Sequence, residues 1–219
     1  MATCGLQRQQ IRDIVLTHAH LDHIAGLPLF LDDLFSVLEE PVRIHATPDV
    51  IEVLERDIFN WSVYPRFSEL SNDFGSIIEY VPFNSGAEFE VSHLKLRAID
   101  VNHRVPSVGF AISNGSSNLI LTGDTAGLDE FWETANLLAK PDVLLIECAF
   151  PDELADLAEV SHHLTPSRLA RELKKFIHTG ASVYVINIKP MYCEQVIRQI
   201  EDLRIDNLKI LEVGRVYDW

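Results

Sequence analysis

The chain has 219 residues, of which 47% are hydrophobic, and its formal net charge at pH 7 is −15. This length is enough for one domain with a sizeable core, and we predict a single domain over residues 1–219. The 33 acidic residues outnumber the 18 basic ones, which disfavours long nucleic acid as a partner because phosphate binding needs clustered Lys and Arg. No run approaches the ~18 to 20 apolar residues of a membrane-spanning helix, so we expect no membrane segment.

The three cysteines, Cys4, Cys148 and Cys193, are widely spaced and odd in number. This usage argues against a disulfide framework and fits a reducing compartment, so we expect ordinary thiols rather than metal ligands. The first 13 residues contain no apolar stretch of the signal-peptide kind, and we therefore expect a cytoplasmic protein.

The first third of the chain alternates strand and helix patterns. It predicts strands at 11–17 and 42–46, and helices at 26–40 and 47–59. The second helix has Thr47 as its N-cap and Pro48 at its first position, which is a favoured helix start.

The middle of the chain is strand-like, and the last third returns to alternation. The middle strands are predicted at 76–81, 87–101, 108–113 and 118–122. Further strands are predicted at 141–150, 181–187 and 208–213, with helices at 165–177 and 194–204. The chain is therefore predicted to be a layered α/β protein.

Three histidines and an aspartate lie within the seven residues THAHLDH, at 17–23. His18 and His20 follow a predicted strand, so the two-residue period points both side chains to one side. Asp22 and His23 come next, on the turn into a helix. Imidazole and carboxylate are expected ligands for Zn, Mn or Fe, so this loop predicts half of a catalytic metal centre. The alternatives are a histidine-rich surface turn or a single structural zinc, although thiolate ligands are absent here.

Three further residues follow apolar strands or precede a helix: His103, Asp124 and His163. Taken singly, each is an ordinary residue for a turn. Taken together, ligand-type side chains that emerge from several strands at one end of a layered sheet are what a metal cleft requires.

The stretch THAHLDHIAGLP resembles the HxHxDH signature of the metallo-β-lactamase superfamily. Further stretches resemble the class II cyclic-nucleotide phosphodiesterases, in the same order over nearly the whole chain: DIFNWSVYPRF, VNHRVPSVGF, LTGDTAGLDEFW, IECAFPDELADLAEVSHHLTP, INIKP and EVGRVYDW. The resemblance implies an αββα sandwich with a dinuclear metal site at one edge of the sheets. Only 17 residues precede His18, so we expect this fold without its first N-terminal strands. Either the chain is truncated or starts late, or a sheet edge lies open, and an open edge would favour a homodimer.

The resemblance also assigns roles to these residues. His18, His20 and His103 would bind one ion, Asp22 and His23 would bind a second, and Asp124 would bridge them. Two divalent ions are expected, with Zn preferred and Mn or Fe as alternatives. Asp22 and His163 are the predicted catalytic residues. His163 is the candidate general acid for the leaving oxygen, a role that requires a carboxylate partner.

Two positions depart from the family pattern. Asn187 stands where relatives carry a histidine that would complete the second metal site, and an amide oxygen is a poorer zinc ligand than imidazole. The second ion is therefore expected to be weakly held, to be a harder metal or to be absent. His162 stands where relatives usually have glycine, and it either compensates for Asn187 or points elsewhere.

The sequence thus predicts a metal-dependent phosphodiesterase that hydrolyses a small cyclic nucleotide, 3′,5′-cyclic AMP by resemblance, through a metal-activated water. One alternative is a tRNA 3′-processing endonuclease of the same superfamily, which the charge of −15 disfavours. The other is a non-catalytic binding or sensor protein with a damaged metal site, which Asn187 would support.

Overall fold

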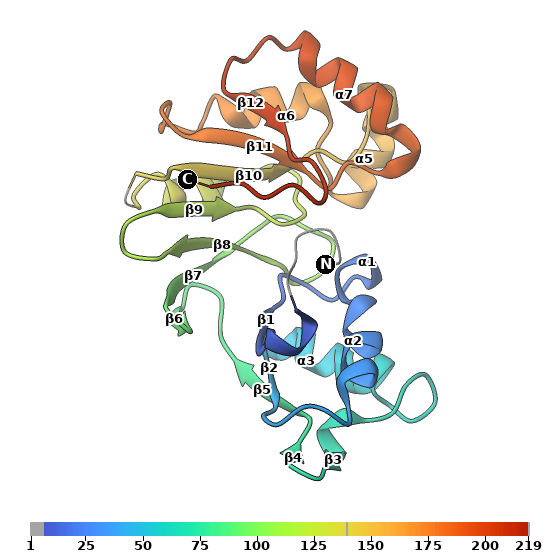
Figure 1. Cartoon of the computed structure of the whole chain (residues 1–219). Coiled ribbons are helices and arrows are strands. Elements are labelled where there is room, and N and C mark those ends of the chain that lie inside the picture. Colours follow the sequence, from blue (N-terminus) through green and yellow to red (C-terminus); the bar gives the residue numbers. More distant parts are fainter. Residues whose placement is uncertain (1–6, 139, 219) are drawn as a thin grey trace. The chain divides into compact units, whose positions relative to one another are not determined.

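The computed structural model describes residues 7–138 and 140–218, which divide into two compact units (Figure 1). Unit 1 comprises Met1–Ser85 and Gly214–Val216, and unit 2 comprises Gly86–Val213 and Tyr217–Trp219. The single domain over 1–219 stays a prediction. Cys4 lies outside the described residues. No helix in the described part of the chain combines the length and hydrophobicity needed to cross a membrane.

Unit 1 is built on a parallel three-stranded sheet in the order β1–β2–β5. Parallel neighbours need a crossover between them, and helices provide it here. The strands are β1 (Asp13–Val15), β2 (Val42–Ala46) and β5 (Ile78–Pro82), with a small hairpin of β3 (Ser71–Asn72) and β4 (Gly75–Ser76). The helices are α1 (Leu21–Ile24), α2 (Gly26–Leu34) and α3 (Pro48–Val53), with short turns at Arg8–Gln10, Leu54–Ile58 and Phe67–Glu69.

The core of unit 1 lies between these helices and the sheet. Leu31 and Leu34 of α2 pack with Val42 and Ile44 of β2, and all four are almost completely buried. The helix predicted over 26–40 ends at Leu34 because the amide of Asn72 donates to the carbonyl oxygens of the next turn, those of Phe35 and Leu38, at 2.8 and 2.7 Å.

The helix predicted over 47–59 begins as expected, with Thr47 at the N-cap position and Pro48 at the first helical position. It is α-helical only to Val53 and continues as a π-helical turn over Leu54–Ile58. The side chain of Thr47 makes no capping hydrogen bond, so the proline sets this helix start rather than the hydroxyl.

Unit 2 contains a seven-stranded sheet in the order β12–β11–β10–β9–β8–β7–β6. Its strands are β6 (Glu88–Val91), β7 (Leu94–Asp100), β8 (Val108–Ser113), β9 (Asn118–Leu121), β10 (Val143–Glu147), β11 (Ser182–Ile186) and β12 (Leu208–Ile210). Its helices are α4 (Asp129–Ala135), α5 (Ala155–Ser161), α6 (Pro166–Leu173) and α7 (Cys193–Asp202), with short turns at Asp152–Leu154 and Pro190–Tyr192. The pairs from β6 to β9 are antiparallel, and those from β9 to β12 are parallel.

Helices α4, α6 and α7 contribute to one core cluster with β9, β10 and β11. The sequence did not predict α4 or α5. The strand predicted over 87–101 is instead a hairpin, because Ser92 adopts a left-handed conformation (φ 56°) that turns β6 back onto β7. The layered α/β fold class is confirmed in both units.

The strand directions in unit 2 determine where its functional residues lie. β7 is antiparallel to β8 and β8 is antiparallel to β9, so β7 runs the same way as β9, β10 and β11. The carboxyl ends of these four strands therefore lie at one edge of the sheet, which is where α/β proteins bind ligands. Residues that follow these strands in the sequence are brought to this edge.

Candidate metal centre

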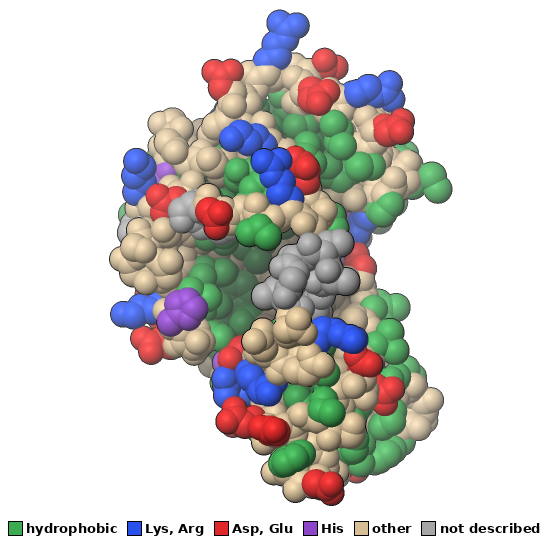
Figure 2. Space-filling view, in the orientation of Figure 1, with side chains coloured by type: hydrophobic (Ala, Val, Ile, Leu, Met, Phe, Trp, Pro, Cys, Tyr) green, Lys and Arg blue, Asp and Glu red, His purple; other side chains and the backbone are tan. Residues whose placement is uncertain are grey.

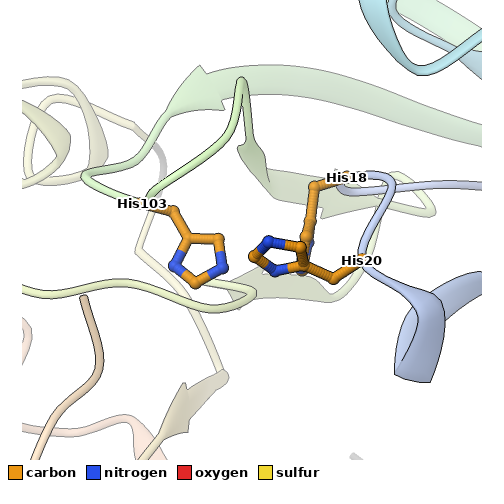
Figure 3. A group of neighbouring side chains, drawn as sticks. All are labelled: His18, His20 and His103. Carbon is orange, nitrogen blue, oxygen red and sulfur yellow. The ribbon is translucent and has the colours of Figure 1, made fainter. Parts of the chain in front are cut away.

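The candidate ligands of unit 1 lie on the loop after β1, which carries His18 and His20, and in α1, which contains Asp22 and His23. The His18 ring lies 4.9 Å from the His20 ring and 4.1 Å from the His23 ring, measured between centroids. The Nε2 atom of His23 is 3.9 Å from Oδ2 of Asp22. His18 is fully buried, whereas the Asp22 side chain is 54% exposed. The contiguous motif therefore gathers four ligand-type side chains, and Figure 3 shows His18 and His20 on this loop.

The unit 2 part contains His103, Asp124 and His163. Each offers a ligand atom, and these atoms all lie within 4.8 Å of one another. His103 follows β7, as Figure 3 shows, Asp124 follows β9, and His163 lies between α5 and α6. Asp124 and His163 are buried. The structure thus brings together three residues that are far apart in the sequence.

The orientation of His103 is set by a main-chain contact. Its Nδ1 lies 3.0 Å from the carbonyl oxygen of His162, so Nδ1 carries the proton and donates it to this acceptor. Nε2 is then the nitrogen with a lone pair for a metal ion. Such an outer hydrogen bond is usual for a metal-binding imidazole.

Glu147, the last residue of β10, is a functional residue that the sequence reasoning missed. Its carboxylate is completely buried, and Oε1 lies 2.7 Å from Nδ1 of His163. It also accepts hydrogen bonds from three main-chain N–H groups, those of Thr125, Ala149 and Leu164, at 2.9 to 3.2 Å. This is the carboxylate partner that the acid role of His163 requires. The available signal was an acidic residue at the end of the apolar run VLLIE.

Burial raises the pKa of Glu147, while the hydrogen bond from His163 and that from the Thr125 main chain lower it. The net effect is a raised pKa, because the four donors around the carboxylate offset only part of its loss of water. The arrangement fixes the His163 ring, because Nδ1 faces Glu147 and Nε2 points away from it.

Asn187 follows β11 at the same sheet edge. Its amide Nδ2 donates a hydrogen bond to Oδ1 of Asp124 at 2.6 Å. Its backbone has φ 53°, a left-handed conformation that asparagine tolerates better than most residues. Asn187 therefore contacts Asp124 through a hydrogen-bond donor.

His162 also has a left-handed backbone, with φ 55°, and it ends α5. This conformation explains a glycine at such a position, since glycine adopts it without steric cost. The Nδ1 atom of His162 lies 2.9 Å from Oδ1 of Asn102, which directs the ring toward the loop after β7. In unit 2, His162 is not part of the group formed by His103, Asp124 and His163.

Imidazole nitrogens and a carboxylate are the donors that Zn, Mn and Fe take in proteins, so His103 and Asp124 fit a divalent ion. The amide N–H of Asn187 does not fit, because it has no lone pair to offer. The cysteines do not take part here: Cys148 and Cys193 form no disulfide, and burial raises the pKa of the Cys148 thiol well above its usual value.

The layered sheets, with imidazoles and carboxylates on loops at strand ends, are those of a metal-binding α/β protein. Comparison with known families gives the more specific assignment. The family described as "Beta-lactamase superfamily domain" matches residues 3–185, and the chain belongs to this family. Its fold is associated with divalent metal ions, and the His and Asp residues above are the candidate ligands.

Similar proteins include the following three. A "Probable 3′,5′-cyclic-nucleotide phosphodiesterase" of Yersinia pestis is 27% identical over 230 residues, which is 94% of this chain and 64% of that protein. A "Nuclear ribonuclease Z" of Triticum aestivum is 33% identical over 108 residues, which is 48% of this chain and 57% of that protein. The crystal structure of unliganded yeast PDE1 has a TM-score of 0.80 at 19% identity and covers 94% of this chain and 68% of that one.

These comparisons confirm the family resemblance and the metallo-β-lactamase type of fold. The chain spans 64% of the length of the Yersinia relative, so a substrate does not follow from the similarity alone.

Proposed function

We propose that the chain is a metal-dependent phosphodiesterase that hydrolyses a small cyclic nucleotide, with 3′,5′-cyclic AMP as the expected substrate. The observation that carries this proposal is the buried His163–Glu147 pair beside Asp124 and His103. Similarity to the Yersinia protein along 94% of the chain supports the substrate class.

The proposed ligands of the metal ion are His18, His20, His103 and Asp124. Asp22 and His23 are the ligands that the family resemblance assigns to a second ion. Within unit 1 the motif histidines lie next to one another, and within unit 2 His103 and Asp124 present their ligand atoms together. A divalent ion bound by these residues would lower the pKa of a water molecule and neutralise phosphoryl charge.

His163 is proposed to act as the general acid. Hydrolysis joins the oxygen of water to phosphorus and breaks one phosphorus–oxygen ester bond of the cyclic phosphate. The leaving oxygen then needs a proton, which Nε2 of His163 would donate, because Nδ1 is engaged with Glu147. The carboxylate of Glu147 orients the ring and stabilises positive charge on it.

A catalytic role for Asp22 is part of the same proposal. Its side chain is the most exposed carboxylate of the two ligand sets and lies next to His23. An exposed carboxylate at this place would accept a proton from the attacking water while it also binds an ion.

A ribonuclease Z activity is the second candidate, and the wheat relative favours it. Charge argues against it, since the chain has a net charge of −15. On the face of the molecule in Figure 2, Lys and Arg side chains are interspersed with Asp and Glu rather than gathered in a stripe. A long polyanion needs such a stripe, whereas a cyclic nucleotide carries a single charge.

The proposal is tested with purified chain reconstituted with Zn²⁺ or Mn²⁺ and supplied in turn with cyclic AMP, cyclic GMP and a tRNA precursor. We expect ring opening of a cyclic nucleotide, detected by ³¹P NMR. His163→Ala should lower this rate by about 10²- to 10⁴-fold without loss of bound metal. His93→Ala, the same change at an exposed turn, is the matched control.

Cleavage of the tRNA precursor without cyclic-nucleotide turnover would favour the ribonuclease. Binding of cyclic AMP without turnover under either metal would favour the non-catalytic sensor. Loss of metal from His163→Ala would identify His163 as a ligand rather than the acid.

A further inference from the structure

We infer that Asn187 limits the metal centre at Asp124 to a single ion per chain. This inference rests on the proposed function, because it concerns the same site. Its basis is the hydrogen bond from Nδ2 of Asn187 to Oδ1 of Asp124. Asn187 is thereby a positioning residue for Asp124, at a place where a second ion would need a ligand.

The topology brings the two residues together across one intervening strand. Asp124 follows β9, Asn187 follows β11, and β10 pairs with both strands. The short Nδ2–Oδ1 distance of 2.6 Å and the burial of Asp124 describe a charge-assisted hydrogen bond in a place with little water. Such a bond holds the carboxylate in a fixed orientation.

The chemistry of the two groups fixes the direction of the amide. An ionised carboxylate only accepts hydrogen bonds, so Asn187 must turn its NH₂ group and not its oxygen toward Asp124. An ion approaching Oδ1 from this side would meet N–H hydrogens, which carry partial positive charge, instead of a lone pair. Turning the amide to offer its oxygen would forfeit the bond to Asp124 and place two oxygens against each other.

Oδ1 of Asp124 therefore already accepts a hydrogen bond from Asn187. Asp124 is then a terminal rather than a bridging ligand. The hydrogen bond from Asn187 stabilises the negative charge of Asp124, as a second ion would do in its place.

The backbone at this position permits a direct test. Histidine is among the residues that tolerate a left-handed conformation, so Asn187→His does not conflict with φ 53°. The variant replaces an N–H donor by an imidazole that offers a lone pair. Asn187→Ala removes the amide and adds no ligand. Asn84→His places the same new imidazole at an exposed position after β5 and serves as the matched control.

Each protein is stripped with a chelator and dialysed against Zn²⁺, and bound metal is measured by elemental analysis and by calorimetric titration. We expect one ion per chain for the wild type, Asn187→Ala and Asn84→His, and two for Asn187→His. Circular dichroism of each apo-protein establishes that the variants are folded.

Two ions in the wild type would overturn the inference, and so would one ion in folded Asn187→His. Loss of the ion from Asn187→Ala would also overturn it, because Asn187 would then be a ligand. No substrate is present in these measurements. Absence of cyclic-nucleotide turnover would therefore overturn the proposed function alone, and two wild-type ions would overturn this inference alone.

Discussion

The candidate ligands of the two units are arranged in different ways. In unit 1, four side chains come from six consecutive residues on a loop and the start of α1, and the Asp22 side chain is largely exposed. In unit 2, His103, Asp124 and His163 come from three separate loops, and two of them are buried. Behind them, Glu147 accepts four hydrogen bonds and Asn187 donates one.

This difference indicates which group of candidate ligands depends on the tertiary fold. A contiguous loop keeps its ligands near one another even when its surroundings change. A set gathered from strand ends depends on the register of the sheet and on the buried carboxylate that joins the loops. Substitutions in the supporting residues of unit 2 should therefore affect both stability and activity, whereas those in unit 1 should mainly affect stability.

Glu147→Ala should have the largest effect. It leaves the buried main-chain N–H groups of Thr125 and Leu164 and Nδ1 of His163 without this acceptor, and each such group costs about 1–3 kcal/mol, whereas the Ala149 N–H keeps its hydrogen bond to a main-chain carbonyl oxygen. We expect the free energy of unfolding to fall by about 3 kcal/mol or more, measured by urea denaturation. Turnover should fall by about 10²- to 10⁴-fold, since His163 loses its orientation.

Two further variants test whether the negative charge of Glu147 is what stabilises the fold and supports turnover. Glu147→Gln keeps one oxygen acceptor, so it should lose less stability, but its neutral amide should still reduce turnover. Glu133→Ala, at an exposed position of α4, should change neither quantity. Wild-type turnover in Glu147→Gln would show that the charge of Glu147 is not needed.

Gly109→Ala, also in unit 2, should cause the next largest loss of stability. A Cβ atom at Gly109 would lie 2.5 Å from the Leu121 carbonyl oxygen and 2.8 Å from a ring carbon of Phe131. Overpacking against main chain costs about 1–3 kcal/mol, which a shift in melting temperature would report. Gly26→Ala in α2 meets no atom within 4 Å and should be neutral or slightly stabilising. Equal melting temperatures for the two variants would contradict the packing seen at Gly109.

Asp13→Asn tests unit 1, where the effect should be on stability and should depend on pH. The Asp13 carboxylate accepts two hydrogen bonds from Arg43 at 2.7 Å and lies 2.8 Å from Nε2 of His45. The hydrogen bond from Arg43 lowers the pKa of Asp13, against a smaller opposing effect of burial. We expect the substitution to cost about 1–3 kcal/mol at pH 7.

The contribution of Asp13 has a defined pH range. Because its pKa is lower in the folded state, its stabilisation is complete above the ordinary value of 3.8 and is lost as pH falls through the folded value. Denaturation curves of wild type and Asp13→Asn should therefore converge below about pH 4. A constant difference down to pH 2 would contradict this origin of the stability.

His162→Gly should have the smallest effect. Glycine relieves a left-handed conformation that costs roughly 1–2 kcal/mol, but it loses the hydrogen bond to Asn102, worth about 0.5–1.5 kcal/mol. The net change in unfolding free energy should stay within about 1 kcal/mol. Metal content should not change, because the carbonyl oxygen that orients His103 belongs to the main chain. Loss of metal would instead give the His162 ring a role at the site.

Several features were predictable from sequence because they are local. The period of apolar residues located β2, β10 and β11, and Thr-Pro pairs located the starts of α3 and α6. The HxHxDH motif located four candidate ligands, since neighbours in sequence remain neighbours on a loop. Helices α4 and α5 were missed, and the turn at Ser92 went unrecognised because an extended pattern continues on both sides of it.

Other expectations stay predictions, among them the residue roles, the homodimer and the absence of the first strands. In the described residues β1 has a single neighbour, β2, so it is an edge strand of the unit 1 sheet. Such an edge is where a second chain would pair if the predicted homodimer forms.

The sequence by itself determined the family, the layered fold class and the identities of the candidate ligands, because motif spacing and hydrophobic period are local properties of the chain. Only the tertiary structure decided that Glu147 is the partner of His163 and that Asn187 donates a hydrogen bond to Asp124. These pairs are 16 and 63 residues apart in the sequence. Asp124 and Asn187 meet because parallel strands align their carboxyl ends at one edge of a sheet, and that alignment requires the sheet to form. His163 reaches Glu147 from the connection between α5 and α6, so this pair depends on how the helices pack beside the sheet.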